Sequence, residues 1–119
     1  MTPEDPGVTS AGILRLAGTP GVRLAVAASG DEGLVLHAEG ADRAVAQAAA
    51  ALGAAIFVRA RSVASACNHG EPGLLRLQCG EGQLMAAAAG STVLIALAEA
   101  GANAGRIRLE LIRAAGELA

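Results

Sequence analysis

The stretch LLRLQCGEGQLMAAAAGSTVLIALA, residues 74–98, decides the fold of this chain. It contains apolar runs at 74–79, 83–89 and 92–98, which are separated by a GEG turn and by a two-residue Gly-Ser connection. Short apolar runs bounded by glycine-containing turns are typical of β-strands, and two-residue connections are typical of hairpins. We therefore predict three consecutive strands joined by hairpins, which favours an antiparallel sheet.

Two further strands are predicted upstream, at 22–28 (VRLAVAA) and 34–39 (LVLHAE). The intervening SGDEG places two acids between glycines, a combination that also occurs in ligand-binding loops. A calcium loop needs more acids at regular spacing, and a phosphate loop at a helix N-terminus does not favour two acids. We therefore predict a plain hairpin loop, in which Gly30 and Gly33 are free to adopt positive φ.

Helices are predicted at 9–16, 42–66 and 104–118, with Asp42 and Asn103 as the N-caps of the second and third. The resulting order is helix, two strands, long helix, three strands, helix. Helices packed on hairpin-linked strands indicate an α+β domain. A length of 119 residues suits a single domain.

The long helix carries two stripes of residues at helical spacing. The larger residues are expected to pack on the sheet: Val45, Ala49, Leu52, Ile56 and Val63. The second stripe is made of small residues: Ala44, Ala48, Ala51, Ala55, Val58 and Ser62. Small residues would let another helix approach closely, although alanine is also the best helix former and needs no partner to explain it. On the other helices, the residues expected to face the sheet are Ile13, Leu14, Leu16, Ile107, Leu111 and Leu118, with Leu109 and Ile112 nearby.

Composition excludes several classes of protein. There is one Phe and no Tyr or Trp, and the formal net charge is −2. Nucleic-acid binding is therefore not expected, because it relies on aromatic stacking or a basic surface. The acidic, proline-containing N-terminus is unlike a signal peptide, and the apolar stretches 44–58 and 84–98 fall short of the roughly 20 residues of a membrane span. We expect a cytoplasmic protein with no membrane insertion.

No catalytic or cofactor site is predicted. Cys67 and Cys79 are expected to be reduced, buried hydrophobes. Cys67 and His69 provide too few ligands for zinc, which needs three or four, and His37 is expected to be structural. No glycine-containing stretch matches a phosphate-binding loop. The sequence therefore predicts a non-catalytic domain without metal or cofactor.

The order of elements resembles the Roadblock/dynein light chain-related family, in particular its bacterial gliding-regulator (MglB-like) members. The resemblance covers about residues 9–118, with 1–8 expected as a flexible N-terminus. It is carried by GVRLAVAASGDEGLVL, the alanine-rich helix, residues 74–98 and the C-terminal NAGRIRLELIRAAGEL. It implies a profilin-like five-stranded antiparallel sheet with helices on both faces.

The resemblance also implies a dimer and a partner. In such proteins the long helices lie side by side, and the strand at 74–79 can pair with its mate into one continuous sheet. The residues expected at the dimer interface are Ala44, Ala48, Ala51, Ala55, Leu75 and Leu77. Bacterial members typically pair with a small Ras-like GTPase, and some accelerate its hydrolysis. The residues expected to contact that partner are Gln47, Ala54, Val58, Arg59 and Arg61.

The expected function is thus a dimeric regulator or scaffold of a small GTPase, in which an arginine could act at the transition state of hydrolysis. Two alternatives remain open. The first is a small-molecule sensing module, since profilin-like sheets resemble sensor domains. The second is an oligomerising adaptor that has no GTPase partner.

Overall fold

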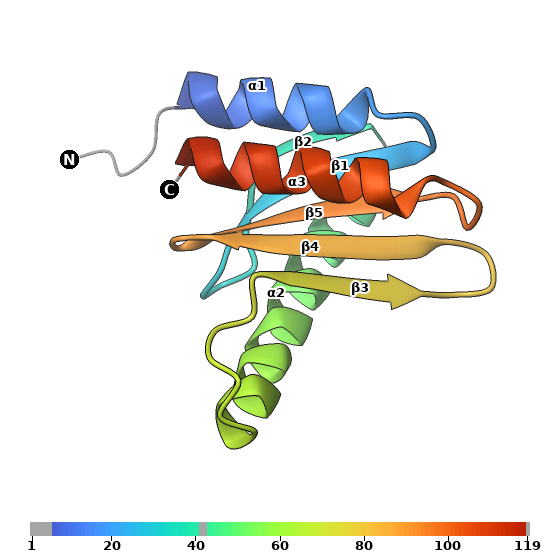
Figure 1. The fold of residues 1–119 in the computed structure, drawn as a ribbon. Helices are drawn as coiled ribbons and strands as arrows, with labels where there is room; N and C mark the ends of the chain where they lie inside the picture. Colours follow the sequence, from blue (N-terminus) through green and yellow to red (C-terminus); the bar gives the residue numbers. More distant parts are fainter. Residues whose placement is uncertain (1–5, 41–42, 119) are drawn as a thin grey trace.

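The computed structural model of the chain describes residues 6–40 and 43–118, and the elements follow the predicted order α-β-β-α-β-β-β-α (Figure 1). The helices are α1 (Pro6–Ala17), α2 (Arg43–Ala66) and α3 (Ala104–Leu118). The strands are β1 (Val22–Ser29), β2 (Val35–Gly40), β3 (Leu74–Gln78), β4 (Gln83–Ala89) and β5 (Thr92–Ala98).

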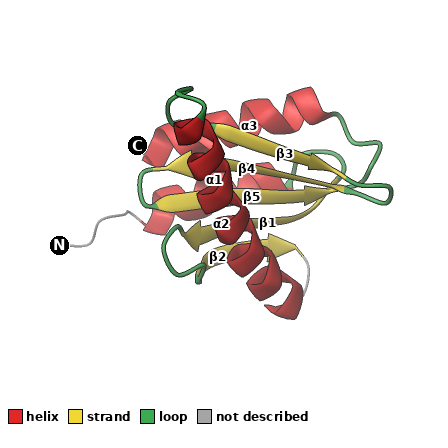
Figure 2. Ribbon diagram, turned by 90° about the horizontal axis from the view of Figure 1, so that it is seen from below, coloured by secondary structure: helices red, strands yellow, loops and turns green. Residues whose placement is uncertain are grey.

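The five strands form one antiparallel sheet in the order β2-β1-β5-β4-β3. Helices α1 and α3 lie side by side on one face, and α2 crosses the other face (Figures 1 and 2). The predicted fold class is therefore confirmed. The β3–β4–β5 hairpins lie where the glycine-containing turns predicted them, and β1 pairs with both β2 and β5.

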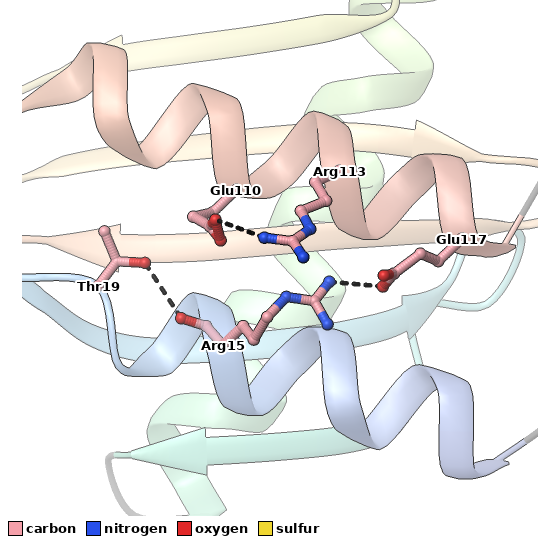
Figure 3. Close-up of polar contacts among 5 residues, drawn as sticks. All are labelled: Arg15, Thr19, Glu110, Arg113 and Glu117. Carbon is pink, nitrogen blue, oxygen red and sulfur yellow. Dashed lines mark hydrogen bonds and ion pairs between the residues drawn. The ribbon is translucent and has the colours of Figure 1, made fainter.

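The sheet separates two apolar cores, because successive strand residues point to opposite faces. On β1, Ala25 and Ala27 face α1 and α3, whereas Leu24 and Val26 face α2. The α1–α3 layer is also joined by an ion pair between Arg15 Nη2 and Glu117 Oε1 at 2.5 Å (Figure 3). Burial on both faces explains why β1, β4 and β5 have continuous apolar runs and not alternating ones.

The face of α2 that packs on the sheet is not the predicted one. Its buried residues are Ala46, Ala49, Ala50, Gly53, Ala54 and Phe57. A Cβ on Gly53 would lie 2.5 Å from Ile95 Cδ1, so any larger residue at this position would force the Ile95 side chain to shift. Apart from Phe57, the helix supplies small side chains to this contact, and the sheet supplies larger ones such as Leu24, Val26 and Ile95. The prediction that Val45, Leu52 and Val63 pack on the sheet was wrong, since all three are exposed.

The SGDEG stretch forms the predicted hairpin loop. Gly33 has φ +68° and its N–H donates to the Ser29 carbonyl at 2.9 Å, whereas Gly30 does not adopt positive φ. A Cβ on Gly33 would lie 2.8 Å from Ala51 Cα, so the loop packs against the backbone of α2. The loop therefore connects two strands and also supports the long helix.

Several boundaries and environments differ from prediction. Helix α1 begins at Pro6, because proline is compatible with the first position of a helix. Strand β2 begins one residue later than predicted and β3 ends one residue earlier. Leu14 and Leu109 are exposed and do not face the sheet, and Ala114 contributes to the α1–α3 core. The expected cap Asp42 and the N-terminal residues 1–5 lie outside the described residues.

The two cysteines were expected to be buried, and this was wrong. Both Cys67 and Cys79 are free and exposed. Each follows the last residue of its element, Cys67 after α2 and Cys79 after β3, so neither lies over the core.

Among the described helices, α2 alone is long and apolar enough to cross a membrane by length and composition. The core helix of a globular domain meets the same criterion, and α2 has a face packed on the sheet.

Candidate functional site

Helix α2 extends beyond the sheet on which it packs. It contacts mainly β1, β2 and β5, and it projects past β3 near the start of that strand (Figure 1). The last buried residue of the helix is Phe57, and no residue from Val58 to Ala66 is buried. Nine residues of helix span about 13 Å. Within the described chain, the final turns of α2 therefore bury no residue against the sheet and contact only the loop that follows the helix.

One exposed flank of α2 is apolar along the length of the helix. Val45, Leu52, Ile56 and Val63 recur at spacings of seven, four and seven, which places them on one flank of the helix. Leu52 and Val63 are each 64% exposed, and Ile56 is half-buried. Contiguous exposed apolar residues mark an interaction surface more often than a random feature of a monomer. We call these four residues the α2 stripe.

An open groove adjoins the α2 stripe at the end of the sheet where β3 meets β4. Its volume is about 430 Å³, and its walls are mainly apolar. Val45 of the α2 stripe forms one wall, while Leu77, Leu84 and Leu97 are contributed by β3, β4 and β5. The groove and the stripe thus form one surface that faces the β3 side of α2.

Strand β3 is the edge of the sheet on this same side. Among the described residues it pairs only with β4. An edge strand presents a row of unpaired backbone N–H and C=O groups, which are a template for pairing with another chain. The free edge, the projecting helix and the apolar groove therefore lie next to one another.

The structure does not bring all the predicted dimer residues together. Ala44, Ala48, Ala51 and Ala55 are exposed, as an interface requires. Ala44 and Ala51 share a flank with Gln47, which lines a pocket with β2 and so faces away from β3. Ala44 and Ala51 therefore lie on the flank of α2 that faces away from β3. Leu75 packs into the core beneath the helix, and Leu77 lines the groove on its β3 side.

The predicted partner residues also divide. Gln47, Val58 and Arg59 are exposed on α2. Ala54 is only 4% exposed, so its assignment to the partner surface was wrong: it lies on the buried face of the helix.

Of the two predicted arginines, Arg61 is engaged and Arg59 is not. Arg61 Nε donates to Glu71 Oε2 at 3.1 Å, in the loop that follows α2. Within the described part of the chain, Arg59 forms no ion pair. Arg59 is therefore the arginine that remains available to an external acidic group.

Sequence reasoning missed the α2 stripe as an exposed surface. The signal that identifies the buried face is Phe57, the only aromatic residue, which lies four residues after Gly53 and in phase with Ala46, Ala49 and Ala50. A large residue among small ones marks the side of the helix that needs to be covered. The larger side chains of the α2 stripe then fall on the outer flank.

The chemistry of the described residues is sparse. No three His, Cys, Asp or Glu side chains gather within residues 6–40 and 43–118 in a way that could hold a metal. His37 Nε2 lies 3.0 Å from Glu39 Oε2 on β2, in a half-buried pair. The most developed feature of the described residues is the apolar surface formed by the α2 stripe and the adjoining groove.

Comparison with known proteins agrees with this architecture. The Roadblock/LC7 domain from Streptomyces avermitilis is 25% identical, with a TM-score of 0.81 over 97% of this chain and 94% of that chain. MglB from Myxococcus xanthus is 19% identical, with a TM-score of 0.85 over 99% of this chain and 90% of that chain. Profilin II from Acanthamoeba castellanii is 19% identical, with a TM-score of 0.59 over 86% and 88% of the two chains.

No curated protein matches the chain in sequence. The sequence model of the Roadblock/LC7 domain, in contrast, matches residues 10–99, from α1 through the end of β5. This match covers most of the 119 residues and is independent of the structural likeness. The chain therefore belongs to the Roadblock/LC7 domain family.

Proposed function

We propose that this protein is a non-catalytic, homodimeric regulator or scaffold of a small Ras-like GTPase in the cytoplasm. Membership of the Roadblock/LC7 family supports the class of function. The observation that supports a dimer is the projection of α2 past the free β3 edge. In a single chain the projecting turns have no sheet beneath them, and the β3 edge has no strand beside it among the described residues.

A two-fold axis beside β3 would pair the free edge of the strand and cover the projecting turns of α2 in the same arrangement. Pairing two copies of β3 edge to edge makes the strands antiparallel, so the start of one β3 lies beside the end of the other. The second sheet then continues beneath the projecting turns of α2. Those turns reach the end of the partner's β3, which is where Leu77 and Leu84 line the groove. The contact is self-complementary, as two-fold symmetry requires.

Helix energetics support the same arrangement. The projecting turns continue a helix that is already formed, so nucleation is not repeated, but in a single chain they gain little of the tertiary packing that supplies most helical stability. Val63, in the projecting turns, also exposes 64% of its surface in a single chain. Covering the α2 stripe with a second copy removes this apolar surface from water, which stabilises the dimer by about 25 cal/mol for each Å² that is buried.

The outer side of the paired α2 helices is the proposed GTPase surface. Arg59 is exposed there and has no ion-pair partner in the described chain. An arginine that reaches the γ-phosphate of a GTPase stabilises the charge of the transition state, and an arginine that binds an acidic surface patch only assists docking. Both roles predict weaker association or slower hydrolysis with Arg59→Ala.

The dimer is tested by measuring molar mass with light scattering during gel filtration. Val63→Arg should convert the dimer to a folded monomer, because it buries a charge in the α2 contact. Leu14→Arg is the matched control, since Leu14 is 55% exposed on α1, across the sheet, and its substitution should leave the dimer intact. A Val63→Arg protein that still has dimer mass would contradict this interface.

The GTPase partner is tested with the protein as bait in lysate of its source, once with a non-hydrolysable GTP analogue and once with GDP. A small Ras-like GTPase recovered mainly with the analogue supports the proposal, and hydrolysis by the purified pair then shows whether the protein accelerates it. Nucleotide-independent recovery of another protein would favour a plain adaptor. Recovery of no protein would favour the sensing alternative.

A further inference from the structure

The outer face of α3 carries an apolar stripe that no element of the described chain covers. Leu109 and Ile112 are 68% and 48% exposed, and Gly105 and Gly116 lie four residues before and after them. Spacings of four, three and four place all four residues on one face of the helix. The stripe spans about 16 Å. We call these residues the α3 stripe.

The α3 stripe continues into a groove between α3 and the β3 side of the sheet. This groove has a volume of about 410 Å³ and lies on the face opposite to α2. Ile112 and Arg108 line it from α3, and Leu74 and Ala87 line it from β3 and β4. An apolar stripe beside an apolar groove is the form of surface that accepts the apolar face of an amphipathic helix.

Gly116 of the α3 stripe is not required by packing within the chain, whereas a Cβ on Gly105 would lie 3.3 Å from the capping Asn103 Oδ1. Glycine within a helix costs about 1 kcal/mol relative to alanine. A Cβ on Gly116 would meet no atom within 4 Å, so packing inside the chain does not require glycine there. Small residues at both ends of the stripe allow the backbone of another helix to approach closely, as Gly53 does for α2 and the sheet.

The charges around the α3 stripe are positive. The two acids of α3 point toward α1 and are engaged, Glu110 with Arg113 at 3.8 Å and Glu117 with Arg15 (Figure 3). Arg106 and Arg108 are exposed, and no ion pair to either occurs in the described part of the chain. The stripe is therefore bordered by arginine side chains whose charge is not compensated.

This charge pattern selects the occupant. A second copy of α3 would bring the same two uncompensated arginines, Arg106 and Arg108, to the borders of the stripe. Like charges in such a contact are unfavourable, so the face is poorly suited to self-association. A helix with leucines on one side and acids along its borders satisfies both the apolar stripe and the arginines.

We propose that the α3 stripe and its groove form a second docking surface, which binds an acidic amphipathic helix of a partner protein. The helix would extend about three turns, with anchors spaced to match Leu109 and Ile112. Because α2 and α3 cover opposite faces of the sheet, the surface is separate from the proposed GTPase contact. Leu74 places one wall of its groove on β3, the strand that pairs in the proposed dimer. This docking surface would make the protein a two-sided adaptor.

The test uses two synthetic helical peptides of 14 residues, capped at both ends. Both carry leucines at positions i, i+4, i+7 and i+11, and the bordering positions are glutamate in one peptide and lysine in the other. We expect saturable binding of the glutamate peptide, with amide chemical-shift changes in ¹⁵N spectra centred on α3, and binding of the lysine peptide at least tenfold weaker.

Charge reversal provides the decisive comparison. Arg108→Glu should weaken binding of the glutamate peptide by about tenfold and strengthen binding of the lysine peptide. Arg43→Glu, on α2, should change the binding of neither peptide. Leu109→Gln should weaken both peptides without unfolding the protein, because Leu109 is exposed. The proposal is overturned if the glutamate peptide does not bind, if both peptides bind equally, or if the shifts map to α2.

Discussion

The close contact between α2 and the sheet gives a prediction whose sign follows from the structure. Substituting alanine for glycine in a helix stabilises it by about 1 kcal/mol when nothing opposes the new methyl group. At Gly53 the methyl would lie 2.5 Å from Ile95 Cδ1 and 3.1 Å from Ile95 Cγ1, and Ile95 is fully buried. Overpacking of this kind costs about 1 to 3 kcal/mol. Gly53→Ala should therefore range from neutral to destabilising by about 2 kcal/mol.

Gly116→Ala is the matched control, because it makes the same substitution in a helix without any opposing atom. It should stabilise the protein by about 0.5 to 1 kcal/mol. For a domain of this size, 1 kcal/mol corresponds to a change in melting temperature of about 4 °C. In thermal unfolding followed by circular dichroism, the melting temperature should thus rise for Gly116→Ala and should stay the same or fall for Gly53→Ala. All proteins are compared at one concentration, since association would shift the midpoint by mass action.

A second substitution tests whether the Cδ1 methyl group of Ile95 causes the loss of stability in Gly53→Ala. Ile95→Val removes Cδ1 and alone should cost about 0.5 to 1.5 kcal/mol. In the Gly53→Ala background it also relieves the clash, so the double variant should be more stable than the sum of the single effects by about 1 kcal/mol or more. Additive effects, or a Gly53→Ala protein as stable as Gly116→Ala, would refute the packing argument.

Two further predictions concern local structure. Gly33→Ala should destabilise the protein by about 2 kcal/mol or more, because Gly33 has a positive φ and a Cβ there would lie 2.8 Å from Ala51 Cα. The loss of stability is measured as a fall in melting temperature. Asn103→Ala should cost about 1 kcal/mol, because Asn103 Oδ1 accepts the Arg106 N–H at 3.1 Å as the N-cap of α3, and urea unfolding measures the loss. An unchanged midpoint in either variant would contradict the corresponding role.

The sequence by itself determined the order and type of the elements. Turn residues such as Gly90 and the SGDEG loop divide the apolar runs at short spacing, so the strands have little freedom in where they begin and end. Asn103 likewise determined the start of α3, since a capping side chain acts on residues next to it. These signals are local, and local signals can be interpreted without knowledge of the rest of the chain.

Only the tertiary structure decided which face of α2 is buried. Alanine is compatible with a helix on any side, so the periodicity offered two faces, and the larger side chains of Leu52 and Val63 favoured the wrong one. The choice depends on the volume that Ile95 and its neighbours leave above the sheet, and Ile95 lies some 40 positions beyond Gly53 in the chain.

The interaction surfaces were hidden from the sequence for the same reason. The projection of α2, the free edge of β3 and the exposure of Leu109 result from how the layers are placed on one another. An apolar residue has the same identity in a core and on a docking face, and only the neighbours that cover it distinguish the two. The sequence therefore determined the elements of this domain, and their packing decided which apolar residues remain available to a partner.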